Sequence, residues 1–406
     1  MKVFVYEHVS GGGYVGQPIS PSVLSEGFGM LRCVAENLKT AGHEVTVLLD
    51  SRLSKLNPLL DIDCTVPIFY PNEPEKFLTS IAKINDAIYI IAPETGRTLQ
   101  TFVELIEQTG KCSLNCASSA IGKTSDKTVL YEMLEKLGVS PKTVILSMND
   151  GLAKTKEIIK ETLSYPLVLK PADGVGGSGL SLVSKENQLA SAVAKISNIS
   201  KEKHFIAQEF IRGETASVSL LSTGKKVKAL SLNKQNIILV GPEATSSYEG
   251  GVVPFEYWLK QEVFKIAEKV TEAFPGLKGY VGVDFVLTEH KSFVVDVNPR
   301  LTTSYIGLRE VAQFNVAEAL VNAVLKGTLP AKLENEGFAC FSKVETSKPT
   351  MDAFQKASKL INVVSPPFPL NENEKSITLI VGEGDTLNDA KLHLEEAKRR
   401  LGSIIT

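Results

Sequence analysis

The chain has 406 residues, a length that predicts about two to four domains. Apolar residues make up 43% of it and charged residues 22%, which is the composition of a soluble globular protein. Because the net charge is only −2, no basic or acidic excess favours binding to nucleic acid or to an anionic membrane. Any chemistry with phosphate groups must therefore come from local clusters of residues.

The five cysteines predict neither a disulfide framework nor a metal site. Only Cys112 and Cys116 lie close together in the sequence, and no histidine cluster completes a set of metal ligands. We therefore expect reduced cysteines in a cytoplasmic protein. In agreement with this, the first residues lack the features of a signal peptide, and no apolar run is long enough to span a bilayer.

The first hundred residues alternate between strand-like and helix-like patterns. Strands are expected at 2–8, 43–50 and 86–93, and helices at 24–42 and 96–110. Such alternation predicts a parallel sheet with helices on both faces. We therefore assign residues 1–115 to an N-terminal Rossmann-like α/β domain.

A glycine-rich loop follows the first expected strand, and residues 11–16 match the G-x-G-x-x-G pattern of dinucleotide binding. That function needs a helix that starts at the last glycine, so that its free N–H groups meet the pyrophosphate. Pro18 and Pro21 keep a helix from beginning before Pro21. Asp50 ends the second strand, but it lies about ten residues beyond the usual spacing of a ribose-binding acid. A dehydrogenase is thus a minor alternative that NAD titration would test, although the loop remains a candidate for ligand contact.

The middle of the chain has mixed patterns, and its last part is short. Expected helices lie at 125–138, 256–274 and 315–327. Expected strands lie at 165–183 around a glycine loop, 204–222, 226–240 and 280–300 with a turn at His290. After about residue 331, strands at 338–346 and 376–384 precede a helix whose apolar residues step by three and four. These are Leu387, Ala390, Leu394, Ala397 and Leu401. We assign 331–406 to a small α+β C-terminal unit.

Lys170 lies on an expected strand that leads into a loop with Gly174, Gly176, Gly177 and Gly179. Glycines at this density let backbone N–H groups converge on phosphate oxygens, and the lysine adds a positive charge. The order differs from the loop of the common nucleotide hydrolases, because the lysine precedes the glycines. A glycine-rich hairpin with a solvated lysine is the alternative.

The strongest signal is a pair of acids in the expected hairpin at 280–300. Asp284 and Asp296 interrupt apolar strands, where a carboxylate is costly unless it is paired or binds a metal. Asn298 and Arg300 follow Asp296 at steps of two and so share its strand face. Oxygen ligands of this kind suit Mg²⁺, and the Arg300 fork suits a phosphoryl group. The alternative is a hairpin whose acids cap local N–H groups.

A weaker signal lies in residues 204–214, which include Gln208, Glu209 and Glu214. A strand end with free backbone groups can pair with an adenine edge, while an acid receives ribose hydroxyls. An ordinary edge strand with charged residues is the simpler interpretation of this segment.

Together these features, in this order, resemble the ATP-grasp ligase family over residues 116–330. The resemblance implies two α+β subdomains that clamp ATP, with a lid at about 140–207, and a pre-ATP-grasp domain at 1–115. The ATP ligands that it implies are Lys127, Lys170, Gly174, Gly176, Gly177, Ser178, Gln208, Glu209, Ile211 and Glu214. Asp284, Asp296 and Asn298 would hold one or two Mg²⁺ ions, for which Mn²⁺ could substitute. Arg300 and Lys170 would be the catalytic residues. Many members have Glu at the positions of Gln208 and Asp296, so this chain departs from the family there.

The family's usual reaction joins a carboxylate to an amine through an acyl phosphate, with release of ADP and phosphate. The stretches "VFVYEHVSGGG", "SEGFGMLRCV" and "DVNPRLTTSYIGL" are similar to the branch that joins glutamate to tyramine for methanofuran-type cofactors. Residues 246–255 would then be a substrate loop, or else an ordinary surface loop. The substrate contacts that we expect are Gly11, Gly12, Gly13, Tyr248, Thr302 and Ser304.

Other interpretations remain open at this point. One is a nucleotide-biosynthesis ligase or a carboxylase-type enzyme of the same family, and another is a non-catalytic nucleotide-binding module. In each case the partners are small molecules, without nucleic acid or membrane, and the sequence allows a homodimer.

Overall fold

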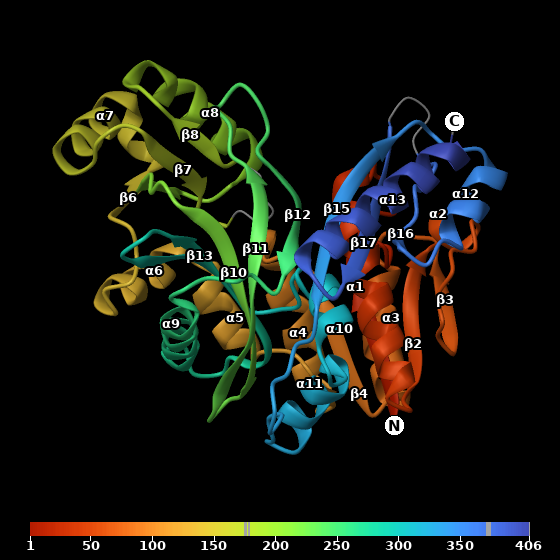
Figure 1. The fold of residues 1–406 in the computed structure, drawn as a ribbon. Helices are drawn as coiled ribbons and strands as arrows, with labels where there is room; N and C mark the ends of the chain where they lie inside the picture. The colour runs from red at the N-terminus through yellow and green to blue at the C-terminus, as the bar shows by residue number, and fades with distance from the viewer. Residues whose placement is uncertain (174–176, 178, 371–374, 406) are drawn as a thin grey trace.

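The computed structural model describes residues 1–173, 177, 179–370 and 375–405, and its strands form three sheets. Figure 1 shows the arrangement, with a small lid sheet at the upper left and the C-terminal strands at the upper right. Long green strands lie between them and belong to the central sheet of the molecule. The mixed α/β and α+β class expected from the sequence is confirmed.

The N-terminal domain is a five-stranded parallel sheet in the order β3-β2-β1-β4-β5. Its strands are β1 (Lys2–Glu7), β2 (Glu44–Asp50), β3 (Cys64–Ile68), β4 (Ala87–Ile91) and β5 (Cys112–Ser113). Its helices are α1 (Pro21–Thr40), α2 (Ser51–Ser54), α3 (Glu73–Ile84), η1 (Thr95–Arg97) and α4 (Thr98–Gln108). Val3 and Val5 of β1 pack into the core on the α1 side, while Phe4 and Tyr6 pack on the α3 and α4 side. Helices therefore cover both faces, as the alternating pattern predicted.

Helix α1 begins at Pro21, the first residue at which the two prolines allow it. The preceding loop folds on itself: the Gly11 N–H donates to the Glu7 carbonyl and the Gly13 N–H donates to the His8 carbonyl, each at 2.8 Å. An ideal Cβ at Gly11 would lie 2.3 Å from the Glu7 carbonyl oxygen. Gly11 and Gly13 are thus explained by close packing and Gly16 by its φ of +79°, and the helix start that a pyrophosphate needs lies several residues away.

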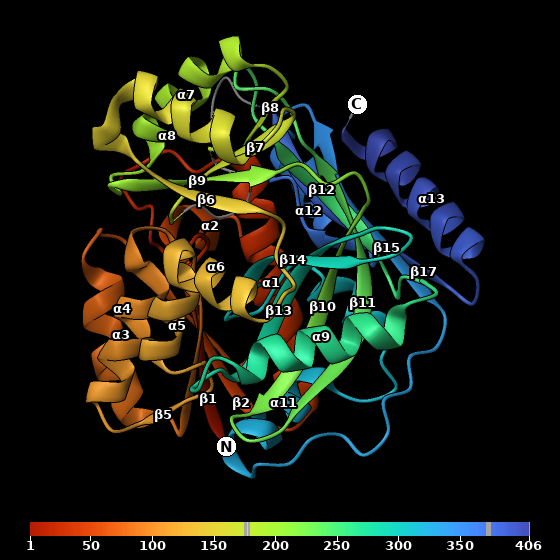
Figure 2. The ribbon, with the colours of Figure 1, turned by 90° about the vertical axis from the view of Figure 1, so that its left-hand side faces the viewer.

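The lid is a four-stranded antiparallel sheet in the order β6-β9-β7-β8. Its strands are β6 (Thr143–Ser147), β7 (Leu167–Pro171), β8 (Ser181–Val183) and β9 (His204–Glu209). Its helices are η2 (Met148–Asp150), α7 (Gly151–Thr162), η3 (Glu186–Gln188) and α8 (Leu189–Ile199). The helices α5 (Ser118–Ser125) and α6 (Lys127–Lys136) connect the N-terminal domain to the lid, which lies above α6 in Figure 2.

The central sheet has eight strands in the order β14-β13-β10-β11-β12-β15-β17-β16. Its first five strands are β10 (Glu214–Thr223), β11 (Val227–Ile238), β12 (Ser247–Val253), β13 (Lys278–Leu287) and β14 (Ser292–Asn298), with helices α9 (Lys260–Glu272), α10 (Tyr305–Val311) and α11 (Val316–Leu325). The remaining elements are β15 (Phe338–Thr346), α12 (Met351–Ser358), β16 (Val363–Ser365), β17 (Ser376–Gly384) and α13 (Leu387–Ile405). Because β15 pairs with β12, the C-terminal unit continues the sheet of the preceding domain.

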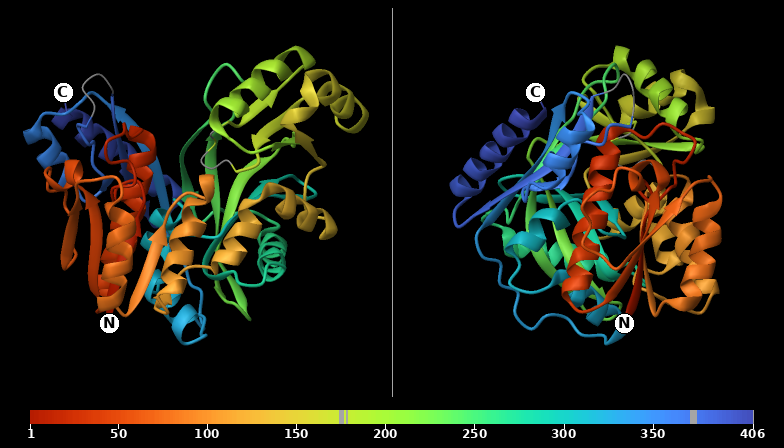
Figure 3. Two further views of the ribbon diagram at one scale, coloured as in Figure 1. Left: turned by 180° about the vertical axis from the view of Figure 1, so that it is seen from behind. Right: turned by 90° about the vertical axis from the view of Figure 1, so that its right-hand side faces the viewer.

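The C-terminal helix buries Ala390, Leu394, Ala397 and Leu401 against the C-terminal strands, as its apolar spacing predicted. Helix α1 packs against β16 and β17, and from behind it lies beside these strands (Figure 3). The N-terminal domain and the C-terminal unit, far apart in the sequence, are thus neighbours in space.

The expectation of a loop at 246–255 is wrong. Ser247–Val253 forms strand β12, which pairs with β11 and β15 inside the central sheet. Two glycines, Gly250 and Gly251, lie within this strand. An ideal Cβ at Gly250 would lie 2.0 Å from the carbonyl oxygen of Phe341, and one at Gly251 would lie 2.3 Å from the carbonyl oxygen of Lys234. The glycines therefore permit close approach of neighbouring strands.

All five cysteines are free, as expected. No helix in the described parts of the chain is both long and apolar enough to cross a membrane.

The loop packing predicts a large loss of stability for Gly12→Ala. Gly12 has φ +100°, and its ideal Cβ would lie 2.6 Å from Cγ2 of Ile68. Gly42 is a matched control, because its φ is +84° but nothing lies within 4 Å of its ideal Cβ. We expect about 1 kcal/mol for Gly42→Ala, from backbone strain alone, and about 3 kcal/mol for Gly12→Ala. Thermal unfolding of both variants measures this, and equal losses would contradict the role of packing.

Candidate active site

Two carboxylates lie directly opposite each other on the β13–β14 hairpin, whose turn lies at 288–291, around His290, as predicted. The strand register pairs Asp284 with Asp296, and Asn298 shares their face. The Asn298 side chain donates a hydrogen bond to Oδ2 of Asp284 at 2.9 Å, and Gln235 donates to Oδ1 at 3.1 Å. The structure thus brings the three predicted metal ligands together.

Burial and mutual repulsion both act on the charge of Asp284. Burial, and then the neighbouring Asp296 carboxylate, raise the pKa of Asp284 to about 6, although Asn298, Gln235 and Arg300 act in the opposite direction. At neutral pH the free protein therefore holds a poorly compensated negative charge at this point of the sheet.

Two lysines approach the hairpin from other elements. Lys127, the first residue of α6, forms an ion pair with Asp296. Lys170, on β7, donates to the Tyr131 hydroxyl at 2.6 Å and to the Val295 carbonyl at 3.3 Å. The Tyr131 hydroxyl in turn donates to the Val295 carbonyl at 2.5 Å. Both predicted phosphate-binding lysines thus lie beside the predicted metal ligands.

The charge on Lys170 is only partly compensated. Burial lowers the pKa of Lys170 to about 7. The Asp296 and Asp284 carboxylates act against this shift, whereas the neighbouring Lys127 ammonium adds to it. A bound phosphate would supply the countercharge that this buried ammonium lacks.

The segment after β14 turns back over the sheet. An ideal Cβ at Gly282 would lie 2.5 Å from Cγ2 of Thr302, so glycine is required where this segment crosses β13. Within it, the Arg300 Nε donates to both carboxylate oxygens of Glu94, at 3.0 and 3.2 Å. Glu94 follows β4, so this pair connects the N-terminal domain to the hairpin.

The predicted adenine and ribose ligands lie at the edge of the lid and at the start of β10. Gln208 is buried, and its amide donates to Oγ1 of Thr143 at 2.9 Å. The N–H of Glu209 donates to the Lys142 carbonyl at 2.9 Å. Glu214, the first residue of β10, is exposed and forms an ion pair of 2.7 Å with Lys234.

The structure describes only some of the other predicted ATP ligands. Ile211 lies between β9 and β10. Gly174, Gly176 and Ser178 lie outside the described residues. Gly177 has φ +81°, a backbone conformation that favours glycine, and its ideal Cβ would lie 3.3 Å from the Ser246 carbonyl oxygen.

The predicted substrate residues Thr302 and Ser304 lie over a polar face of the central sheet. Oγ of Ser304 is 3.2 Å from Oγ of Ser217, and Oγ1 of Thr302 is 3.4 Å from the Tyr280 hydroxyl. Ser217 is opposite Asp284 in the register of β10 and β13, so this polar face is continuous with the metal ligands.

Tyr248 lies farther along the same sheet, on β12. Its ring centroid is 6.4 Å from that of Phe341 and 5.8 Å from the Lys343 ammonium. Substrate contact at Tyr248 and at Gly11, Gly12 and Gly13 stays a prediction.

Four side chains that contact predicted site residues did not emerge from the sequence: Glu94, Tyr131, Gln235 and Lys343. One sequence signal could have found Gln235. It lies two residues beyond Asn233 in the expected strand at 226–240, so strand alternation places these two polar side chains on the same face. The others pair with residues far away in the sequence, and no local pattern marks them.

A family model for the pre ATP-grasp domain matches residues 43–121, and one for the ATP-grasp domain matches residues 124–304. A tyramine–L-glutamate ligase of Methanocaldococcus fervens is 32% identical over 253 residues, which cover 62% of this chain and 71% of the relative. The chain belongs to the ATP-grasp ligase family. These similarities support an ATP-dependent ligase that forms C–N bonds, as the sequence motifs predicted.

Solved structures agree with this assignment. A protein from Archaeoglobus fulgidus assigned to the ATP-grasp superfamily has a TM-score of 0.63 and 26% identity, and the match covers 94% of this chain and 99% of that one. The biotin carboxylase domain of 2-oxoglutarate carboxylase from Hydrogenobacter thermophilus, solved with MgADP, ADP and bicarbonate, has a TM-score of 0.72. That match covers 98% of this chain and 89% of the other, and at 13% identity it shows the fold alone.

ATP and Mg²⁺ are general features of this family, and the side chains present here fit them. Asp284 and Asp296 offer hard oxygen ligands, Asp284 with a poorly compensated charge, and Asn298 adds an amide oxygen. Within the described residues, no group of three or more His, Cys, Asp or Glu side chains forms a metal site. Two acids and one amide leave coordination positions for nucleotide phosphates, as Mg²⁺ sites in ATP-dependent enzymes commonly do.

The pKa of Asp284 predicts opposite effects of Asp284→Asn on stability and on binding. An acid whose pKa is raised by folding destabilises the folded state progressively as the pH rises from the ordinary value of 3.8 through about 6, and the neutral amide removes that cost. We expect the melting temperature at about pH 7.5 to be unchanged or higher, with a smaller gain at about pH 5 and none at about pH 3. We expect Mg²⁺-dependent binding of ADP, measured by calorimetry, to weaken at least about tenfold. A lower melting temperature with unchanged binding would contradict this.

The pKa of Lys170 predicts that nucleotide binding weakens at high pH. The free protein loses the Lys170 proton above about pH 7, whereas the phosphate complex keeps it, so a rise in pH opposes binding. We expect the ADP affinity to fall between about pH 7.5 and about pH 9.5, by up to tenfold per unit. Lys170→Met should bind ADP more weakly and with a flatter pH dependence. The same slope in both proteins would exclude Lys170 as the titrating group.

Proposed function

We propose that this enzyme joins the carboxylate of L-glutamate to an aromatic amine such as tyramine, through an acyl phosphate and with release of ADP. The observation that carries the proposal is the convergence of three oxygen ligands, two lysines and an arginine on one hairpin. The named activity of the Methanocaldococcus relative supports the choice of substrates.

In the first step, a carboxylate oxygen of the acid attacks the γ-phosphorus of ATP, and the bond to the bridging oxygen of ADP breaks. In the second step, the amine nitrogen attacks the acyl carbon, loses a proton, and phosphate leaves. Mg²⁺, held by Asp284, Asp296 and Asn298, would neutralise charge on the phosphates. The rest of the catalytic effect comes from position and charge, as in other phosphoryl transfers.

The protein's own side chains would hold the reacting groups in line. Lys127 and Lys170 would contact phosphate oxygens, and Arg300 would bind the transferred phosphoryl group. The guanidinium of Arg300 is held by two hydrogen bonds to Glu94, so its orientation is set before substrate arrives. Closure of the lid would exclude water from the acyl phosphate.

The polar face beyond the metal ligands supports a polar acid as one substrate. Ser217 and Ser219 both accept hydrogen bonds from the Asn233 amide, at 3.2 and 3.0 Å, and the Tyr280 hydroxyl donates to Ser219 at 2.7 Å. Together with Ser304 these groups form a buried hydrogen-bonded network along the sheet. Such a network fixes the surface on which Thr302 and Ser304 would meet the substrate.

The test is an assay of the purified protein with ATP, Mg²⁺, glutamate and tyramine. We expect ADP and phosphate to form in amounts equal to the amide, which mass spectrometry identifies as the γ-glutamyl product. Arg300→Met should lower kcat at least about a hundredfold, because it removes a donor that acts on the transferred charge. Absence of amine-dependent ADP formation across a broad panel of acids and amines would overturn the proposal.

A carboxylase-type reaction is the second candidate. The likeness to a biotin carboxylase domain extends over 98% of the chain and so includes the C-terminal unit. ATP hydrolysis that depends on bicarbonate, and not on an amine, would favour this alternative in the same assay.

A further inference from the structure

Three parts of the chain meet at the side chain of Glu26. This residue lies on α1 of the N-terminal domain, and its Oε1 forms an ion pair with Lys343 of β15. Its Oε2 accepts a hydrogen bond from the Thr303 hydroxyl at 3.0 Å. Lys343 also donates to the Ser22 hydroxyl at 2.7 Å. The N-terminal domain, the ATP-grasp domain and the C-terminal unit therefore each contribute to one small cluster.

The cluster lies beside the reactive end of the site. Thr303 is three residues beyond Arg300, in the segment that turns back over the sheet. The carboxylates of Glu94, Asp284 and Glu26 raise the pKa of Arg300, against the effect of burial. Ser304, which follows Thr303, has its Oγ 3.2 Å from that of Ser217. Ser217 is opposite Asp284 in the sheet, so the contact between Thr303 and Glu26 is close to the polar face that leads to the metal ligands.

Within the pair, Glu26 is the more accessible partner. The Glu26 side chain is 24% exposed, whereas that of Lys343 is only 6% exposed. The Lys343 ammonium is surrounded by Glu26, Ser22 and the ring of Tyr248. Each oxygen of Glu26 has one partner and can accept a further hydrogen bond. Lys343 thus fixes the carboxylate in place, and Glu26 is the group that a ligand can reach.

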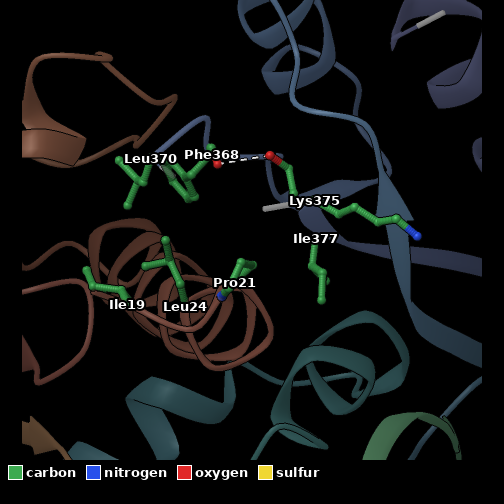
Figure 4. Close-up of a pocket in the computed structure, with 8 residues that line it drawn as sticks. Ile19, Pro21, Leu24, Phe368, Leu370, Lys375 and Ile377 are labelled. Carbon is green, nitrogen blue, oxygen red and sulfur yellow. Dashed lines mark hydrogen bonds between the residues drawn. The ribbon is translucent and has the colours of Figure 1, made fainter. Parts of the chain in front are cut away.

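The contact between α1 and the C-terminal unit also contains apolar packing. The Phe28 ring packs against Phe368 with centroids 4.9 Å apart. Figure 4 shows Leu24 of the same helix opposite Phe368 and Leu370 around a small apolar recess. Apolar packing joins the two parts without the desolvation cost of a buried ion pair. The charges at Glu26 and Lys343 therefore call for another explanation.

We propose that Glu26 binds an ammonium group of a substrate, with Lys343, Ser22 and Thr303 as positioning residues. The inference rests on the proposed function, which requires an amine and, for glutamate, an α-ammonium group. Both present a cationic nitrogen with N–H donors, which a fixed carboxylate recognises by charge-assisted hydrogen bonds. A reactive amine held in this way passes one proton to solvent water before its lone pair attacks the acyl carbon, and it loses a second proton as the amide forms.

The test compares Glu26→Gln with the wild-type enzyme in the amide-forming assay. We expect the KM of the substrate whose ammonium binds Glu26 to rise at least about tenfold, while the KM of ATP stays within about twofold. Glu36→Gln is a matched control, because Glu36 lies on the same helix, is 18% exposed and pairs with Arg32 and Arg309. It should leave every KM unchanged.

Glutarate, which lacks the α-ammonium, distinguishes the two sources. If Glu26 binds the α-ammonium of glutamate, the wild-type enzyme prefers glutamate to glutarate and Glu26→Gln loses that preference. If Glu26 binds the amine, the KM of tyramine rises and the preference persists. If Glu26→Gln leaves the KM of both substrates unchanged, or if Glu36→Gln changes them equally, the role of Glu26 is overturned while the proposed function stands. A wild-type enzyme inactive with all acids and amines overturns the proposed function as well.

Loss of the Glu26 charge leaves Lys343 without its counterion, so the melting temperature is measured in parallel. The double variant E26Q/K343M removes both charges and repeats the KM test in a protein without a stranded ammonium. Lys343→Arg, which keeps a cation beside Glu26, should preserve the substrate KM better than Lys343→Met does. Equal effects of these two substitutions would contradict a positioning role.

Discussion

The site depends on one constraint, which is that two carboxylates are held side by side in a sheet. Asp284 and Asp296 are opposite in the register of β13 and β14, where burial and then repulsion from Asp296 oppose the charge of Asp284. The surrounding groups offset that cost: Lys127 pairs with Asp296, and the amides of Asn298 and Gln235 donate to Asp284. In a protein without a cationic ligand, an amide in place of Asp284 would remove this cost, so the charge of Asp284 indicates that the site binds a cation.

The continuous central sheet gives the C-terminal residues a place in the same site. The pairing of β12 with β15 carries the sheet past the ATP-grasp domain, and it brings Lys343 beside Tyr248. The close approach at Gly250 and Gly251 allows this pairing. Residues 331–406, whose role no sequence motif indicated, thus supply a charged group near the reaction site.

The parts of the site that the sequence predicted are those encoded locally. Asp284, Asp296 and Asn298 lie within one hairpin, so strand alternation and a turn suffice to place them on one face. The ion pairs that orient the site are different, because Arg300 and Glu94 are 206 residues apart and Lys343 and Glu26 are 317 apart. In the sequence, a single acid or lysine of this kind looks the same as an ordinary surface residue. Only the folded structure shows the partner with which it pairs. The strand β12 was misassigned for a related reason, since glycines that serve sheet packing have the same local pattern as a turn.

The glycine-rich loop near the N-terminus shows how a motif can match while its usual function does not apply. The buried Glu7 carboxylate accepts hydrogen bonds from the Val9 N–H at 3.0 Å and from the Ser10 N–H at 2.7 Å, which folds the loop over the end of β1. An ideal Cβ at Gly27 of α1 would lie only 2.7 Å from that carboxylate, so the helix crosses directly over it. The position of Gly27 also sets that of Glu26, its neighbour in the chain. The loop therefore contributes to the site through the placement of α1, and its glycines are required by this packing rather than by a pyrophosphate.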